Sequence, residues 1–196
     1  MKENSMKTHS YALVLAILCG SASCAPASGS AKTSSHLPKW ITVKTPEYTL
    51  QLPQGWSIGP QTPFGQRTLA PKSAQKPVGT FMTAMTAPQP VASSWSQLYH
   101  TALYFITQQD PSLKATPYHL WRSPQGMSAC SWEMKNTKGQ IRGLYTVLRS
   151  SSMQLLALSV HIPNTTTEKT LSICFQHLVD TAQLHAAPSK SVRPTK

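Results

Sequence analysis

MSACSWEMKNTKGQIRGLYTVLRSSSMQLLALSVHI, the segment at residues 127–162, contains three apolar runs that are separated by short polar turns. Alternation of apolar and polar residues predicts strands at 127–135, 140–149 and 153–162. The polar residues 136–139 predict a hairpin between the first two strands. Consecutive strands joined by short turns usually pair with each other, so this segment predicts an antiparallel meander.

An amphipathic helix is predicted on each side of the meander. Ser94-x-x-Gln97 is a capping box, and apolar residues follow it at helical spacing from Trp95 to Ile106. Thr165-x-x-Glu168 is a second capping box, and it opens a stripe with the same spacing over residues 171–182. Each stripe needs an apolar sheet face to cover. The predicted fold class is therefore α+β, an antiparallel sheet with two amphipathic helices packed on it.

The region before the first helix is rich in proline. Residues 48–52, YTLQL, alternate and predict a strand that stops at the turn formed by residues 53–56, PQGW. Eight of the sixteen prolines lie within residues 46–90. Short strands, including one at 79–86, are therefore expected there rather than long helices.

The pattern Tyr-x-Leu-x-Leu-Pro-x-Gly-Trp at residues 48–56, followed by a helix, a strand meander and a closing helix, resembles the PsbP-like and DcrB-like group. The resemblance covers the predicted domain and implies an α/β/α sandwich. Known members are extrinsic photosystem subunits, a Ran-binding factor and bacterial envelope lipoproteins, which share no catalytic residues. The resemblance therefore implies a binding module rather than an active site.

The first 23 residues predict a bacterial export signal, because a basic start is followed by the apolar residues 12–18 and then by small residues. Ala22-Ser23-Cys24 resembles a lipoprotein lipobox, in which the cysteine is acylated, with palmitate among its chains, and becomes the N-terminus. Ser21 departs from the aliphatic residue of that pattern. Cys24 is the predicted lipidation site, and ordinary cleavage with soluble export is the alternative. Ala25, rather than aspartate, follows the cysteine, which by the resemblance implies the outer membrane, facing the periplasm.

Composition divides the remaining chain into three parts. Residues 24–43 predict a flexible tether, 44–186 the PsbP-like α+β domain, and 187–196 a disordered basic tail. The longest apolar stretch, residues 11–19, is much shorter than the roughly 20 residues of a spanning helix, which excludes a polytopic membrane protein.

The sequence offers few residues for catalysis or metal binding. After residue 23 there are five carboxylates, and capping and turn formation account for Glu168 and Asp110. Cys174-x-x-His177 has ligand-like spacing but no second pair, so neither a metal site nor a cofactor is expected. Residues 126–130, GMSAC, resemble a nucleophile elbow without its final glycine. The leading prediction is a non-catalytic binding or scaffolding domain, and the alternative is a secreted hydrolase that uses Ser128 or a histidine.

The chain is strongly basic, with 18 Lys and Arg against 6 Asp and Glu and a formal charge of +12. Lys135, Lys138, Arg142 and Arg149 fall on or beside the predicted hairpin. Such charge favours attraction to an anionic lipid surface, and a generally basic surface without a specific partner is the alternative. Nucleic acid is not an expected partner, because aromatic and basic residues are not interleaved and an exported protein meets little of it. An envelope protein partner is also expected, which the sequence does not identify.

Cys130 and Cys174 are predicted to share one core. Alternation places Cys130 on one face of its strand with Trp132 and Met134, and Cys174 falls in the apolar stripe of the closing helix. The two cysteines share a core if that helix covers that face. An oxidising compartment permits a disulfide, whereas two buried thiols are the alternative, and both stay open at this point.

Overall fold

The computed structural model describes residues 38–63, 65–72, 82–87, 94–152, 154–163 and 165–185. Within these residues the strands are β1 Trp40–Lys44, β2 Tyr48–Pro53, β3 Trp56–Ile58, β4 Gln66–Pro71, β5 Met82–Ala87, β6 Lys114–Ala115, β7 His119–Arg122, β8 Ser128–Lys135, β9 Ile141–Arg149, β10 Leu155–His161 and β11 Gln183–Leu184. The helices are α2 Trp95–Gln109 and α3 Thr165–Thr181.

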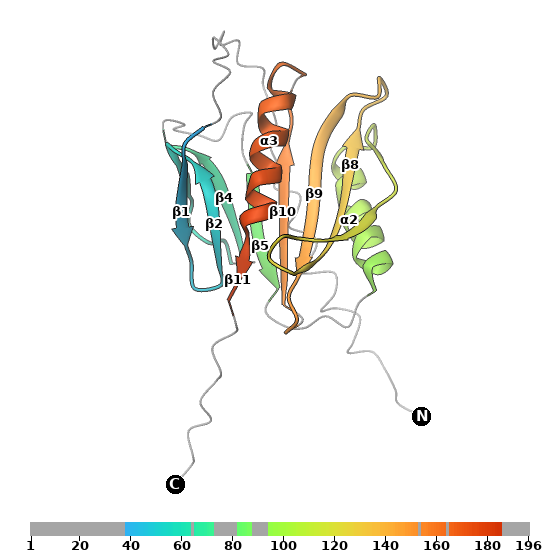
Figure 1. The fold of residues 1–196 in the computed structure, drawn as a ribbon. Helices are drawn as coiled ribbons and strands as arrows, with labels where there is room; N and C mark the ends of the chain where they lie inside the picture. Colours follow the sequence, from blue (N-terminus) through green and yellow to red (C-terminus); the bar gives the residue numbers. More distant parts are fainter. Residues whose placement is uncertain are drawn as a thin grey trace, which may run out of the picture.

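The strands form two antiparallel sheets (Figure 1). The large sheet has the order β3-β4-β5-β10-β9-β8-β6, and β7 also pairs with β8. The small sheet has the order β1-β2-β11. Strands β8, β9 and β10 are neighbours in the large sheet, which confirms the predicted meander.

Each face of the large sheet supports its own core. One core lies beneath α3 and includes Leu148, Leu156 and Leu158, while the other lies beneath α2 and includes Val147 and Leu155. Neighbouring residues of one strand enter different cores because successive side chains point to opposite faces. Figure 1 shows α3 in front of the large sheet and α2 behind β8 and β9. The α+β sandwich predicted from the sequence is therefore confirmed.

Helix α2 begins at the predicted capping box. The Ser94 hydroxyl accepts a hydrogen bond from the Gln97 N–H, and the Gln97 side chain accepts one from the Ser94 N–H. These bonds satisfy two donors that the first helical turn would otherwise leave without partners. The predicted stripe is buried at Leu98, Tyr99, Ala102 and Ile106.

Helix α3 begins at Thr165, and the side chain of that residue lies outside the described part of the structure. The predicted stripe is buried throughout, at Leu171, Cys174, Phe175, Leu178, Val179 and Ala182. The strand expected at 48–52 is β2, and Gly55 turns the chain after it with φ of 87°, in the left-handed region that favours glycine.

The prediction that Cys130 and Cys174 share a core is wrong. Cys174 lies in the core beneath α3, and Cys130 lies in the core beneath α2 on the other side of the sheet. Both are buried free thiols. The alternation on β8 correctly grouped Cys130 with Trp132 and Met134, but alternation does not tell which helix covers that face. Helix α3 covers the opposite face, where Ala129 lies.

The predicted boundary between tether and domain is also wrong. Residues 40–43 belong to β1, which pairs with β2 from Trp40 opposite Pro53 to Lys44 opposite Thr49. This strand is only partly buried, so its apolar residues form no strong pattern. Strands β6, β7 and β11 were not predicted, because they are too short to show periodicity, and β3 and β4 were covered only by the general expectation of short strands within residues 46–90. The predicted strand at 79–86 corresponds to β5, and its first three residues lie outside the described ones.

The export signal, Cys24, most of the tether and the basic tail lie outside the described residues.

A thiol titration tests whether Cys130 and Cys174 are unbonded and buried. Burial raises the pKa of Cys130 to about 11 and also raises that of Cys174, so both stay protonated and unreactive near neutral pH. We expect exported protein that carries Cys19→Ser and Cys24→Ser, and so retains only Cys130 and Cys174, to show two thiols per chain when it is titrated in urea without reductant. The native protein should react far more slowly. Fewer than two thiols in urea would contradict the assignment of two unbonded cysteines.

Candidate ligand-binding groove

A groove of about 460 Å³ lies between α3 and the part of the large sheet formed by β7, β8 and β9. Helix α3 packs on β2, β9 and β10, so the face of the sheet toward the β7 edge is left partly uncovered. The groove is lined by His119 and Trp121 of β7, Ser131, Trp132 and Glu133 of β8, Ile141, Leu144, Tyr145 and Thr146 of β9, and Ser172, Phe175 and Gln176 of α3.

Strand alternation decides which side chains face the groove. Ser131 and Glu133 lie on the same face of β8 as Ala129, which belongs to the α3 core. Trp132 and Tyr145 instead pack in the α2 core, where their rings stack with centroids 5.5 Å apart. These two residues therefore border the groove through their backbone.

A chain of hydrogen bonds crosses three strands at the floor of the groove. The Trp121 indole N–H donates to the Ser131 hydroxyl over 2.9 Å, and Ser131 shares a further hydrogen bond of 2.9 Å with the Thr146 hydroxyl. Ser131 and Thr146 lie directly opposite each other on β8 and β9. Because Thr146 is buried and needs a partner, this network holds the floor in one arrangement.

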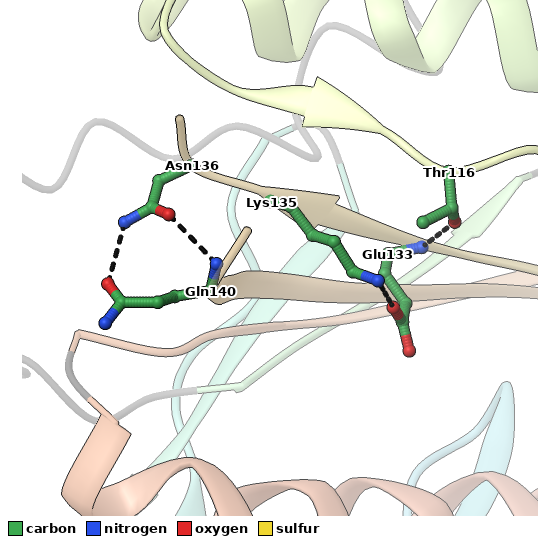
Figure 2. Close-up of polar contacts among 5 residues, drawn as sticks. All are labelled: Thr116, Glu133, Lys135, Asn136 and Gln140. Carbon is green, nitrogen blue, oxygen red and sulfur yellow. Dashed lines mark hydrogen bonds and ion pairs between the residues drawn. The ribbon is translucent and has the colours of Figure 1, made fainter. Parts of the chain in front are cut away.

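The rim beside the β8–β9 hairpin is polar (Figure 2). Glu133, a groove residue, forms an ion pair of 3.0 Å with Lys135, and the side chains of both are 38% exposed. Exposed pairs of this kind contribute at most about 1 kcal/mol, so the pair orients the carboxylate more than it stabilises the fold. The N–H of Glu133 donates to the Thr116 hydroxyl over 3.0 Å, which fastens the segment between β6 and β7 to β8.

Side chains within the hairpin fix its shape. The Asn136 carboxamide oxygen accepts hydrogen bonds from the N–H groups of Lys138 and Gln140, and its amide donates to the Gln140 side chain over 2.9 Å. Arg142 donates to the same Gln140 side chain and to the carbonyl oxygen of Pro163 over 2.7 Å. The hairpin is thereby tied to the chain that enters α3.

Ser128, the serine singled out from the sequence, lies outside the groove. It is on the α2-facing side of β8, in register with Arg122 on one neighbouring strand and Arg149 on the other. Among the described residues, no hydrogen bond joins its hydroxyl to a histidine. Arg149 lies 4.2 Å from the ring centroid of Trp95, which gives this face a cation–π contact.

Two histidines make structural contacts at the edge of the small sheet. His177 of α3 stacks on Trp40 with ring centroids 3.6 Å apart and shares a hydrogen bond of 2.9 Å with Gln51. Burial lowers the pKa of His177, and Asp180 opposes that shift. His185 bonds to Thr49 over 2.8 Å. The described residues include no group of three or more His, Cys, Asp or Glu side chains placed to hold a metal ion.

Sequence reasoning did not identify the groove. Trp121 and His119 lie on β7, a four-residue strand that was not predicted, and the course of α3 over the sheet is a tertiary feature. One signal was available. Ser131 and Thr146 are polar residues in the interior of two neighbouring predicted strands, Ser131 between two buried residues and Thr146 itself buried.

Comparison with known proteins shows similarity of fold but no match of sequence. No protein-family model and no curated protein match the sequence. The solution structure of cyanobacterial PsbP (CyanoP) from Synechocystis sp. PCC 6803 matches 80% of this chain and 98% of its own, with a TM-score of 0.54 and 10% identity. The chain has a PsbP-like fold.

A second solved structure is LpqN, involved in cell envelope biogenesis of Mycobacterium tuberculosis. It matches 76% of this chain and 91% of its own, with a TM-score of 0.47 and 13% identity. At sequence identities this low, structural similarity indicates a shared fold alone, and a shared fold does not assign an activity. No helix in the described part of the PsbP-like chain is long and apolar enough to cross a membrane.

The hydrogen bonds at the groove floor give a test with a matched control. Ser131→Ala removes the acceptor of the Trp121 N–H and one partner of Thr146. We expect it to lower the free energy of unfolding by about 1 to 2 kcal/mol in urea titrations. Ser128 is a half-buried serine on the same strand whose side chain has no hydrogen bond to the described residues, so Ser128→Ala should change that free energy by less than about 0.5 kcal/mol. Equal losses in the two variants would show that the network does not hold the floor.

Proposed function

We propose that the protein is a lipid-anchored protein of the bacterial cell envelope, whose domain is a non-catalytic binding module. Its ligand lies in the groove between α3 and strands β7 to β9. The observation that carries the proposal is the groove itself, because its floor is a fixed hydroxyl network and its walls combine apolar and polar side chains.

The composition of the groove indicates an amphiphilic ligand. Phe175, Ile141 and Leu144 offer apolar surface, and Gln176 and Glu133 offer hydrogen-bonding groups. A volume of about 460 Å³ lies within the range of roughly 300 to 1,000 Å³ that is usual for small-molecule sites. The groove is formed by strands and a helix, which hold such groups more firmly than loops do.

The contacts of Ser131 support binding rather than hydrolysis. Its hydroxyl is engaged by Trp121 and Thr146, whereas a nucleophilic serine needs a hydrogen bond to a base. His119 lies opposite Ser131 on β7, but no hydrogen bond joins the two side chains. The alternative of a hydrolase that uses Ser128 or a histidine has no comparable support, because Ser128 lies on the other face of the sheet.

The anchor is proposed from the sequence. Cys24 follows an export signal and small residues, and 15 residues separate it from Trp40, where β1 begins. A chain of this length spans at most roughly 55 Å, which is enough to hold a domain beside a bilayer. Ala25, which follows the cysteine where an aspartate would be expected for an inner-membrane lipoprotein, supports an anchor in the outer membrane, facing the periplasm.

Replacing Cys24 by Ser tests the anchor. We expect the wild-type protein to sediment with membranes and to have a mass above that of the polypeptide by the attached acyl chains. Cys24→Ser should move the protein to the soluble fraction without that added mass. Unchanged partition and mass would contradict lipidation, and a soluble wild-type protein cleaved elsewhere would favour ordinary export.

A neutral fluorescent amphiphile, N-phenyl-1-naphthylamine, tests the groove. We expect it to bind the Cys24→Ser protein with one-to-one stoichiometry. Ser172→Trp places a large side chain in the groove wall and should weaken the binding at least about tenfold, the effect of losing about 1.4 kcal/mol. Ser151→Trp, at an exposed turn position between β9 and β10, is the matched control and should leave the affinity unchanged. Equal affinities for all three proteins would exclude the groove as the binding site.

A further inference from the structure

The strand register brings the ends of several strands together at one end of the molecule. Strand β1 begins there, opposite the end of β2, and the turn at Gly55 lies beside Lys72 at the end of β4. The first residues of β5 and β9 and the last residues of β8 and β10 also lie there. In Figure 1 the arrows of β8 and β10 point toward it, and those of β1 and β9 point away.

This end, called the basic end here, has more cations than carboxylates, and its net charge exceeds that of the opposite end. Its basic residues are Lys39, Lys72, Lys114, Lys135, Lys138, Arg142 and Lys169. Among the described residues, the carboxylates near them are Asp110, Glu133 and Glu168, and Glu133 is already paired with Lys135. The opposite end has Lys44, Arg67, Arg122 and Arg149 against Glu47 and Asp180. Among the described residues, the net charge is therefore +4 at the basic end and +2 at the opposite end.

Most of these cations are available to an external partner. Lys39, Lys72, Lys114, Lys138 and Lys169 are exposed, and Lys138 lies at the tip of the β8–β9 hairpin. The hairpin is braced by Asn136, Gln140 and Arg142, so it presents Lys138 from a fixed position.

The chain enters the domain at the same end. Trp40 begins β1 at the basic end, whereas β11, the last strand, pairs with the opposite end of β2, at Tyr48 and Thr49. A lipid on Cys24 would therefore draw the basic end, rather than the opposite end, toward the bilayer. This step rests on the proposed function, which supplies the anchor.

We propose that the basic end is a docking surface for anionic lipid headgroups, so that the domain stands on the membrane with its strands running away from the bilayer. Charge and chain entry point to the same end, and attraction between lysines and anionic lipids acts within about 8 Å at physiological salt. The tether, at most roughly 55 Å long, keeps the domain close to the bilayer, so that the lysines repeatedly come within this range.

The test compares two double charge reversals in the full exported chain with Cys24→Ser, which has no lipid. Lys72→Glu with Lys138→Glu changes exposed residues at the basic end, and Lys44→Glu with Arg122→Glu changes exposed residues at the opposite end. Both variants lower the net charge by four units and retain the same N-terminal and C-terminal segments. Binding is measured by sedimentation with vesicles of phosphatidylcholine containing 30% phosphatidylglycerol, and with phosphatidylcholine alone.

We expect the unsubstituted protein to bind the anionic vesicles at low ionic strength and to lose most of this binding near 0.15 M salt. The basic-end variant should bind at least about tenfold more weakly, and the opposite-end variant less than about threefold more weakly, since each cation at the surface contributes roughly fivefold. Equal losses in the two variants, or equal binding to neutral vesicles, would overturn the proposal. These measurements need no lipid on Cys24, so their failure is distinct from failure of the anchor.

Discussion

Strand β10 is buried on both faces, and this burial requires cover on each side of the sheet. None of the six residues from Leu155 to Val160 is more than 6% exposed, and they enter the two cores alternately. A strand of this kind is stable only at the centre of a sheet that is covered on both sides. Strands β5 and β9 therefore flank it, and α3 and α2 cover its two faces. The PsbP-like sandwich is the arrangement that meets this requirement.

The parts of the fold that follow from local patterns could be predicted from the sequence. The capping box at Ser94, the two apolar helical stripes and the meander of residues 127–162 each depend on residues close together in the chain. The pairing of β5 with β10 and the cover of each face depend on contacts between distant residues. For that reason the alternation around Cys130 identified its face correctly while its relation to Cys174 was wrong.

The groove depends on long-range geometry in the same way. Trp121 reaches Ser131 only because β7 pairs with β8, and the space above them exists because α3 lies over β9 and β10 instead. The sequence showed the two polar positions, Ser131 and Thr146, but not the strand that completes the network. The basic end could be predicted only in part. Its lysines are evident in the sequence, but only the strand register shows that they lie together.

The outer edge of β8 is divided between two short strands. In the described part of the chain, β6 pairs with its last two residues and β7 with its first four, and residues 116–118, which include Pro117, interrupt the edge between them. An unbroken, flat edge strand can recruit another copy of the same chain and start aggregation. With the proposed anchor, copies of the protein would meet on the membrane at high two-dimensional density, which favours such recruitment. The interrupted edge leaves at most four consecutive residues for a new ladder, so crowded neighbours cannot extend this sheet from one molecule to the next over a long register.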